Sequence, residues 1–382
     1  MIFPLELAAH YLRCLELCKR LKPKFDIKIA YSAKYAKFIE EVGLETFRVE
    51  NFDPEEIKSA AARFDFSWLN LTSIGQILES QITVVKEYEP DIVLGDASFP
   101  LKMAAEKTRT RFVSMLNGYM TKHYQFTRKV SRAHPGYEYS KKMPATLFDY
   151  LTRLIEYVSF RKIHEPFRQL RKELELSPQN SFLDELEGEK NLICDLPELF
   201  PQKSPPPNYC FIGPMFYRGS DPEQEILDFM ADNRSNILVS MGSSGSMRQV
   251  AFLNNPIFKK CNIVVSGDPN MTLKGPNIIN KLFINHMAIM PKIDIMICHG
   301  GNGTIYQGLS RGVPILSIPN NFEQEWNAQR IEELGLGCTI ENSATAEEVH
   351  ELVNFWIEKR RDAAFTSFKQ KIHEFSQKSI QL

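Results

Sequence analysis

The stretch Cys298-His299-Gly300-Gly301-Asn302-Gly303-Thr304 directly follows the apolar run of residues 293–297 and precedes a helical pattern. Glycines allow the backbone to turn sharply and to approach a ligand closely. The free N–H groups and the positive dipole end of the following helix attract anions. The stretch therefore predicts a phosphate-binding turn between a strand and a helix, with tight packing of the turn as the alternative.

An alternation of strand and helix patterns extends in both directions from this turn. Thr345 and Glu348 have the spacing of a capping box and predict the start of a helix. Residues 25–31 alternate apolar with other side chains as a strand does, and apolar runs of strand length lie at residues 92–94, 111–115, 236–240, 262–265 and 313–317. Strands that alternate with helices imply right-handed βαβ units and parallel sheets. The sequence predicts two α/β halves with a ligand cleft between them, at the carboxyl ends of their strands.

The boundary between the halves is indicated by proline. Residues 201–207 include three consecutive prolines, which continue neither a helix nor a central strand. We place the linker near Gly213-Pro214, so that residues 1–214 form the first domain and residues 215–360 the second. Residues 361–382 are expected to form a C-terminal helix, for which packing against the first domain is one option.

Composition excludes several classes of protein. The 382 residues are 43% hydrophobic and carry a formal net charge of −1, which gives no reason to expect a nucleic-acid partner. Seven cysteines without a CxxC pair indicate reduced thiols rather than a disulfide framework or a zinc site. The apolar N-terminus is short and lacks a basic leader, and no apolar run approaches the ~20 residues of a membrane span. We therefore expect a cytoplasmic protein.

The glycine-rich turn and the residues after it resemble the donor site of GT-B glycosyltransferases. The matching stretches are His299-Gly300-Gly301-x-Gly303-Thr304, Gly312-Val313-Pro314, Pro319, Glu323-Gln324 and Asn327-Ala328. The resemblance is closest to bacterial natural-product glycosyltransferases and to UDP-glycosyltransferases of plants and animals. It implies two Rossmann-like parallel-sheet domains that face each other across a cleft, and a hexosyltransferase-type enzyme (EC 2.4).

The resemblance also implies a set of donor-binding residues. The turn from His299 would hold the nucleotide diphosphate, Glu323 and Gln324 the sugar hydroxyls, and His286 would lie beside the base, unless it is an ordinary polar loop residue. The sequence departs from the family pattern at Glu323, where many relatives have Asp, and at Gln307, where many have a ribose-binding Glu. The full donor set is Gly242, Ser243, His286, His299, Gly300, Gly301, Asn302, Gly303, Thr304, Glu323 and Gln324.

The catalytic pair would come from the first half. His10 stands where relatives carry a general-base histidine after the first strand, although Ala9 replaces the usual glycine. Asp96 follows residues 92–95 and matches the aspartate that pairs with that histidine. A carboxylate fixes the imidazole tautomer and stabilises the imidazolium that forms when a hydroxyl loses its proton. The alternatives are a surface histidine for His10 and a helix N-cap for Asp96.

Residues 121–172, rich in aromatic and basic side chains, are the candidate region for acceptor recognition. The alternatives are a solvated helical face, which suits the charged residues better than the aromatic ones, or, for a lipid acceptor, a peripheral membrane contact. The overall prediction is an inverting transferase that moves a sugar from a UDP- or dTDP-linked donor to a hydroxyl of a small-molecule or lipid acceptor. No metal and no other cofactor is expected. A non-catalytic nucleotide-sugar-binding or activator protein is the alternative, and a GT-B-shaped epimerase is a more distant one.

Overall fold

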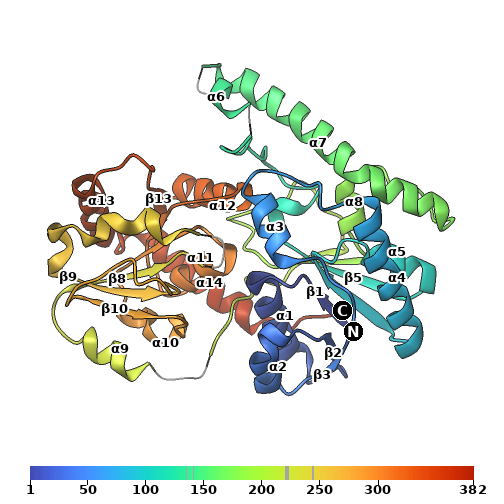
Figure 1. Cartoon of the computed structure of the whole chain (residues 1–382), viewed down its shortest axis with the longest axis horizontal. Helices are drawn as coiled ribbons and strands as arrows, with labels where there is room; N and C mark the ends of the chain where they lie inside the picture. The colour runs from blue at the N-terminus through green and yellow to red at the C-terminus, as the bar shows by residue number, and fades with distance from the viewer. Residues whose placement is uncertain (135, 141, 220–222, 243–244) are drawn as a thin grey trace. The chain divides into compact units, whose positions relative to one another are not determined.

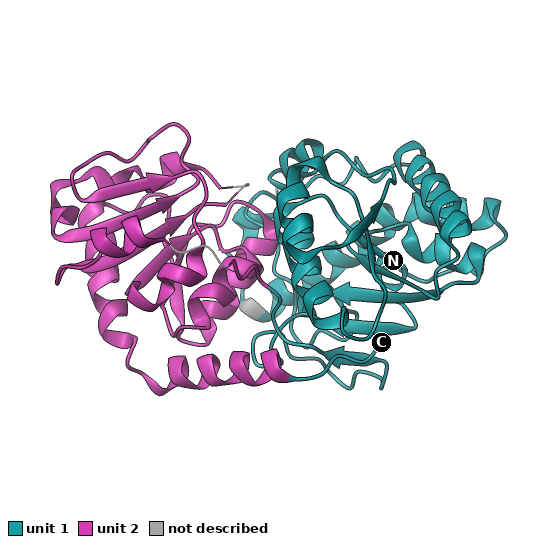
Figure 2. Ribbon diagram, turned by 90° about the horizontal axis from the view of Figure 1, so that it is seen from below, with its two compact units in different colours: residues 1–215, 378–382 teal, residues 216–377 magenta. Residues whose placement is uncertain are grey.

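The computed structural model describes residues 1–134, 136–140, 142–219, 223–242 and 245–382. These form two compact units, which Figure 2 shows in different colours. Unit 1 contains residues 1–215 and 378–382, and unit 2 contains residues 216–377. The division thus falls one residue beyond the predicted linker position at residue 214. Helix α14 (Ala363–Gln377) belongs to unit 2, and only the five residues after it belong to unit 1.

Unit 1 is built on a seven-stranded sheet in the order β3-β2-β1-β4-β5-β6-β7, in which every neighbouring pair is parallel. The order reverses between β1 and β4, because the chain first adds strands on one side of β1 and then on the other. Such a switch point leaves a crevice at the carboxyl ends of the two central strands. The strands are β1 (Ile2–Pro4), β2 (Lys28–Ala30), β3 (Glu45–Phe47), β4 (Ile92–Asp96), β5 (Arg111–Leu116), β6 (Lys190–Ile193) and β7 (Tyr209–Phe211).

Helices cover both faces of this sheet, as Figure 1 shows. Successive strand residues point to opposite faces, so Phe3 belongs to one apolar cluster and Ile2 to the other. The first cluster includes side chains of α3, α4, α5, α7 and α8, and the second includes those of α1 and α2. The helices are α1 (Ala8–Leu21), α2 (Ala36–Val42), α3 (Pro54–Ala61), α4 (Leu71–Tyr88), α5 (Leu101–Thr108), α6 (Tyr137–Ser140), α7 (Ala145–Glu173) and α8 (Phe182–Leu186).

Unit 2 has a six-stranded parallel sheet in the order β10-β9-β8-β11-β12-β13. Its order reverses between β8 and β11, which makes a second switch point. The four apolar runs predicted for this half overlap β8, β9, β11 and β12, since a parallel sheet covered on both faces consists of nearly continuous apolar residues. The edge strands β10 and β13 were not predicted. The strands are β8 (Ser235–Ser240), β9 (Cys261–Ser266), β10 (Ile278–Lys281), β11 (Ile295–Cys298), β12 (Ile315–Ser317) and β13 (Gly337–Thr339).

The helices of unit 2 are α9 (Gln224–Phe229), α10 (His286–Ile289), α11 (Asn302–Leu309), α12 (Phe322–Glu333), α13 (Ala346–Lys359) and α14. The capping box predicted at the start of α13 is confirmed: the Thr345 side chain accepts from the N–H of Glu348, and the Glu348 carboxylate accepts from the N–H of Thr345. In unit 1 the candidate acceptor region, residues 121–172, contains α6 and nearly all of α7, but residues 121–134 form no α-helix.

The two parallel-sheet units confirm the predicted α/β fold class. Within the described residues, none of the helices combines the length and the apolar character needed to cross a membrane.

Candidate active site

The glycine-rich turn lies at the switch point of unit 2, at the carboxyl end of β11. Gly300 has a φ of +87°, a backbone conformation that favours glycine, and the chain then enters α11 at Asn302. A side chain at Gly300 would lie 3.1 Å from the backbone oxygen of Gln324, because the start of α12 packs against the turn. The N-terminal turn of an α-helix carries a partial positive charge that attracts anions, and α11 begins at this turn. The turn therefore has the geometry of a phosphate site.

His299 is held between the backbones of two glycines. A Cβ added to Gly301 would lie 2.4 Å from its Nε2, and one added to Gly242, which has a φ of +59°, would lie 2.5 Å from its Cε1. The ring is buried, with its Nδ1 3.4 Å from the carbonyl oxygen of Ser240 at the end of β8. Burial disfavours the imidazolium and lowers the pKa of His299. A neutral ring therefore lies where β8 and β11 end side by side.

The start of α12 supplies the predicted sugar-binding pair, Glu323 and Gln324. Glu323 is partly exposed in the first turn of the helix. Gln324 is buried, and its side-chain carbonyl accepts from the N–H of Asn320 at 2.7 Å. Asn327, one turn further along, is fully buried and donates to the carbonyl oxygen of Gly300 at 2.9 Å. Asn327 thus fixes the turn, a structural role that the motif alone did not predict.

His286, predicted to lie beside the base, contacts Gln307, a position at which the sequence departs from the family pattern. The Nδ1 of His286 lies 2.9 Å from Oε1 of Gln307, and the Gln307 amide donates to the carbonyl oxygen of Tyr217 at 3.2 Å. Burial lowers the pKa of His286. The half-buried His286 is therefore part of a polar chain with Gln307 and the Tyr217 backbone, and both polar ends of the Gln307 amide have protein partners.

Of the remaining predicted donor residues, Gly242, Asn302, Gly303 and Thr304 lie at this edge of the unit 2 sheet or in the first turn of α11. Ser243 lies outside the described residues.

His10 and Asp96 meet at the switch point of unit 1. Pro4 and Asp96 are register partners at the ends of β1 and β4, and His10 lies in the first turn of α1. His10 Nδ1 lies 2.9 Å from Oδ1 of Asp96. His10 has 14% side-chain exposure and Asp96 has none, so His10 is not a surface residue. Asp96 is not a helix N-cap either, since α5 is preceded by Pro100 in that position.

Arg13, one turn after His10 on α1, is a member of this cluster that sequence reasoning missed. Its Nε donates to Oδ2 of Asp96 at 2.5 Å, its Nη2 pairs with Oδ1, and its Nη1 donates to Oδ1 of Asn117 at 2.7 Å. Nη2 also lies 3.1 Å from Nδ1 of His10. The spacing of three residues from His10, which puts both side chains on one helix face, was the available signal.

The buried carboxylate is thus shared between a cation and an imidazole. Burial would raise the pKa of Asp96, but the charges of Arg13 and His10 and their hydrogen bonds lower it to about 2. A charged Asp96 accepts from a His10 that carries its proton on Nδ1, which leaves Nε2 as the basic nitrogen. The arrangement can hold an imidazole in the tautomer that a general base requires.

Aromatic residues of the predicted acceptor region divide into packed and exposed groups. The His123 ring packs edge-on against Tyr209, with 4.9 Å between centroids, and the His134 ring packs similarly against Phe64. Phe126 and Tyr139 are exposed.

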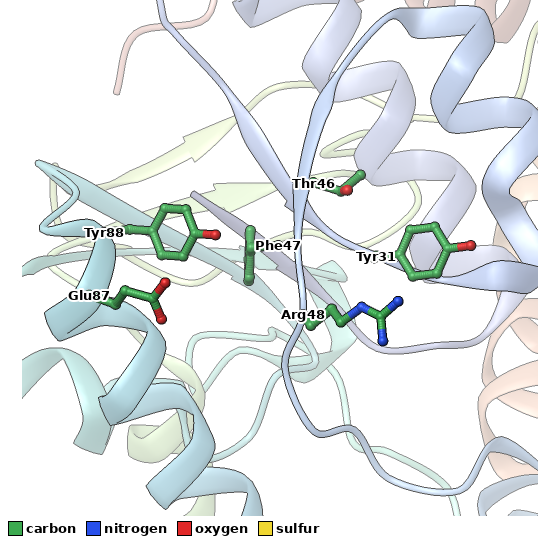
Figure 3. A pocket seen from close by; sticks show the side chains of 6 residues that line it. All are labelled: Tyr31, Thr46, Phe47, Arg48, Glu87 and Tyr88. Carbon is green, nitrogen blue, oxygen red and sulfur yellow. The ribbon is translucent and has the colours of Figure 1, made fainter.

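A separate hollow of about 580 Å³ lies at the β3 edge of unit 1 (Figure 3). None of its lining residues was predicted to be functional, and it contains one basic and one acidic side chain among polar and aromatic ones. The lining residues are Tyr31, Thr46, Phe47, Arg48, Glu87 and Tyr88.

Among the described residues, no group of three or more His, Cys, Asp or Glu side chains is arranged to hold a metal ion.

Comparisons with known proteins find glycosyltransferases. The family model described as the glycosyltransferase family 28 C-terminal domain matches residues 236–382. The chain is 21% identical over 338 residues to a PGL/p-HBAD biosynthesis rhamnosyltransferase of Mycobacterium bovis, an alignment that covers 87% of this chain and 74% of that protein. It is 22% identical to the NDP-glycosyltransferase YjiC of Bacillus subtilis, covering 82% of this chain and 77% of the relative.

Solved structures share the fold along almost the whole chain. The glycotransferase of kitacinnamycin superimposes with a TM-score of 0.72 at 17% identity, covering 98% of this chain and 94% of that one. The spinosyn rhamnosyltransferase SpnG, solved with spinosyn aglycone, has a TM-score of 0.66 at 16% identity, covering 98% and 95%. This chain is a glycosyltransferase with the GT-B fold, and its residues 236–382 match the glycosyltransferase family 28 C-terminal domain.

Proposed function

We propose that this enzyme transfers a sugar from a UDP- or dTDP-linked donor to a hydroxyl of a small-molecule or lipid acceptor, with inversion at the anomeric carbon. The observation that carries the proposal is the turn at the start of α11, where the His299 ring lies beside the positive end of the helix. The named relatives act on sugars, and SpnG was solved with an acceptor aglycone.

Unit 2 would bind the donor. The N–H groups of residues 302–304 and the His299 ring would contact the diphosphate, and the Glu323 carboxylate would accept hydrogen bonds from sugar hydroxyls. Phe283, with 52% of its surface exposed, lies three residues before His286 and offers a flat face to a nucleobase. The positive helix end and these donors would stabilise the leaving diphosphate without a metal ion.

His10 of unit 1 would act as the general base. An oxygen lone pair of the acceptor hydroxyl forms a bond to the anomeric carbon while the bond from that carbon to the diphosphate oxygen breaks. The hydroxyl proton moves to Nε2 of His10, and the diphosphate leaves with the bonding electrons. Attack opposite the leaving group inverts the configuration. Asp96 would hold the ring and stabilise its charged form, and Arg13 would fix Asp96.

The donor assignment can be tested by calorimetric titration with UDP, dTDP and GDP. We expect binding of UDP or dTDP in the presence of excess EDTA, because helix N–H groups and His299 replace a cation. His10→Ala is the matched control, since it should leave nucleotide affinity unchanged.

Once a donor and an acceptor are identified, NMR of the anomeric proton in the product tests inversion. Retention of configuration, or turnover that disappears in EDTA and returns with Mg²⁺, would contradict the proposal.

A further inference from the structure

The N-terminal half of α7 carries an apolar stripe that faces away from the rest of unit 1. Its members recur at intervals of three or four residues and therefore lie on one helix face. Each exposes between 48% and 69% of its surface. Figure 1 shows α7 extending from the region of α8 toward α6. The stripe consists of Leu147, Tyr150, Leu154, Tyr157 and Val158.

The opposite face of the same helix is already used for packing. Thr152 is buried, and Glu156 pairs with the buried Arg128 at 2.5 Å. Arg128 in turn donates to the carbonyl oxygens of Tyr119 and Thr121, so a network of hydrogen bonds ties the inner face of α7 to the preceding loop. Further along, α7 contacts α4 and α8 through buried side chains such as Phe167. The outer stripe is therefore additional to the face that folds the helix.

Basic side chains accompany the stripe. Arg153 and Lys162 are exposed on its two sides, and Arg161 is exposed within it. Lys and Arg outnumber Asp and Glu three to one over residues 121–172, whereas the whole chain has a net charge of −1. Leu and Val with interfacial Tyr rings and long basic side chains are the composition of helices that lie in the surface of an anionic bilayer.

We propose that the outer face of α7 binds the surface of an anionic lipid bilayer. The aliphatic side chains enter the boundary between headgroups and acyl chains, the tyrosines lie at headgroup level, and Arg153, Arg161 and Lys162 contact lipid phosphates. A second copy of the chain fits this face less well, since pairing two stripes would bring their arginines together. The proposal concerns binding alone and is independent of the donor and the catalytic base.

Vesicle co-sedimentation tests the proposal. Wild-type protein should bind vesicles of phosphatidylcholine with 30% phosphatidylglycerol, and bind pure phosphatidylcholine more weakly. The variant Leu147→Gln/Leu154→Gln/Val158→Gln should lower the partition coefficient at least tenfold. The variant Arg153→Gln/Arg161→Gln/Lys162→Gln should lower it about fivefold per charge removed on anionic vesicles, and little on neutral ones. Glutamine favours helix and these positions are exposed, so circular dichroism should show intact protein.

A matched control replaces exposed apolar residues elsewhere, with Met271→Gln/Phe355→Gln in unit 2, and should bind as wild type does. The proposal is overturned if wild type binds neither vesicle, or if both α7 variants bind as wild type does. It is equally overturned if wild type forms a dimer in light scattering that the apolar variant abolishes, with no vesicle binding. That result would assign the stripe to a second copy of the chain.

Discussion

The buried ion pair of Arg13 and Asp96 should control the stability of unit 1, and a double-mutant cycle measures how strongly. Arg13→Met removes the cation and leaves the fully buried Asp96 carboxylate without it, and Asp96→Asn removes the negative charge that pairs with Arg13. Each single change should lower the free energy of unfolding by about 3–5 kcal/mol, because each leaves an uncompensated buried charge. The double variant should cost less than the sum of the singles, since it leaves no charge unpaired.

The pH dependence of the free energy of unfolding gives a second measure of how the cluster stabilises unit 1. The pKa of Asp96 is about 2 in the folded chain against an ordinary value of 3.8, so its ionisation contributes about 2 kcal/mol of stability above pH 4. Since the folded pKa is the lower one, this contribution is lost as the pH falls from about 4 to about 2. In Arg13→Met the remaining burial should raise the pKa of Asp96, so the cost of that variant should shrink on acidification.

Urea unfolding followed by tryptophan fluorescence can measure these values for unit 1. The chain has three tryptophans, of which only Trp68 belongs to unit 1. In a Trp326→Phe/Trp356→Phe background, Trp68 reports the unit that contains the ion pair. This account of the cluster would be refuted if the losses in free energy of unfolding of the two single variants added up to that of the double variant. It would also be refuted if the loss caused by Arg13→Met were the same at pH 7 and at pH 4.

Three further predictions concern the proposed chemistry. His10→Ala should lower turnover by about two to four orders of magnitude in steady-state assays while nucleotide affinity stays intact; near-full activity would assign the base elsewhere. His299, neutral when free because burial lowers its pKa, should take up a proton as its Nε2 donates to a phosphate. The nucleotide affinity of the wild type should then fall as the pH rises from 6 to 8. At pH 6 the His299→Ala variant should bind nucleotide about tenfold or more weakly than the wild type. Calorimetry in buffers of different ionisation enthalpy should detect the proton that His299 takes up on binding. Gly301→Ala should weaken nucleotide binding as His299→Ala does, since the added methyl group would displace the ring; affinity equal to wild type would contradict the role of that contact.

The sequence predicted those strands that consist of apolar runs buried on both faces of their sheet, whereas β3, β6, β7, β10 and β13 lie outside the predicted runs. Residues 236–240, for example, lie within β8. The glycine-rich turn was equally visible, since Gly300 adopts a backbone conformation that other residues avoid. The pairing of His10 with Asp96 was expected from family resemblance alone, because residues 86 positions apart carry no local sign of their contact.

Features that depend on tertiary packing could not be predicted in the same way. Arg13 has the pattern of a solvated helical residue, yet the fold surrounds it with Asp96 and Asn117. The apolar residues of α7 have the spacing of a core face, and only the structure shows that Leu154 and its neighbours stay exposed. Periodicity indicates that a helix has an apolar side, but not what covers that side.

Unit 1 is discontinuous along the chain, and this affects how it is made. Ile380 is buried in the apolar cluster beneath α1, and Arg20 and Lys24 donate to the backbone of Lys378 and the side chain of Ser379. The ribosome synthesises all of unit 2 before these residues. The first unit to emerge is therefore the last to be completed, and until then part of its apolar surface stays open to water and to chaperones.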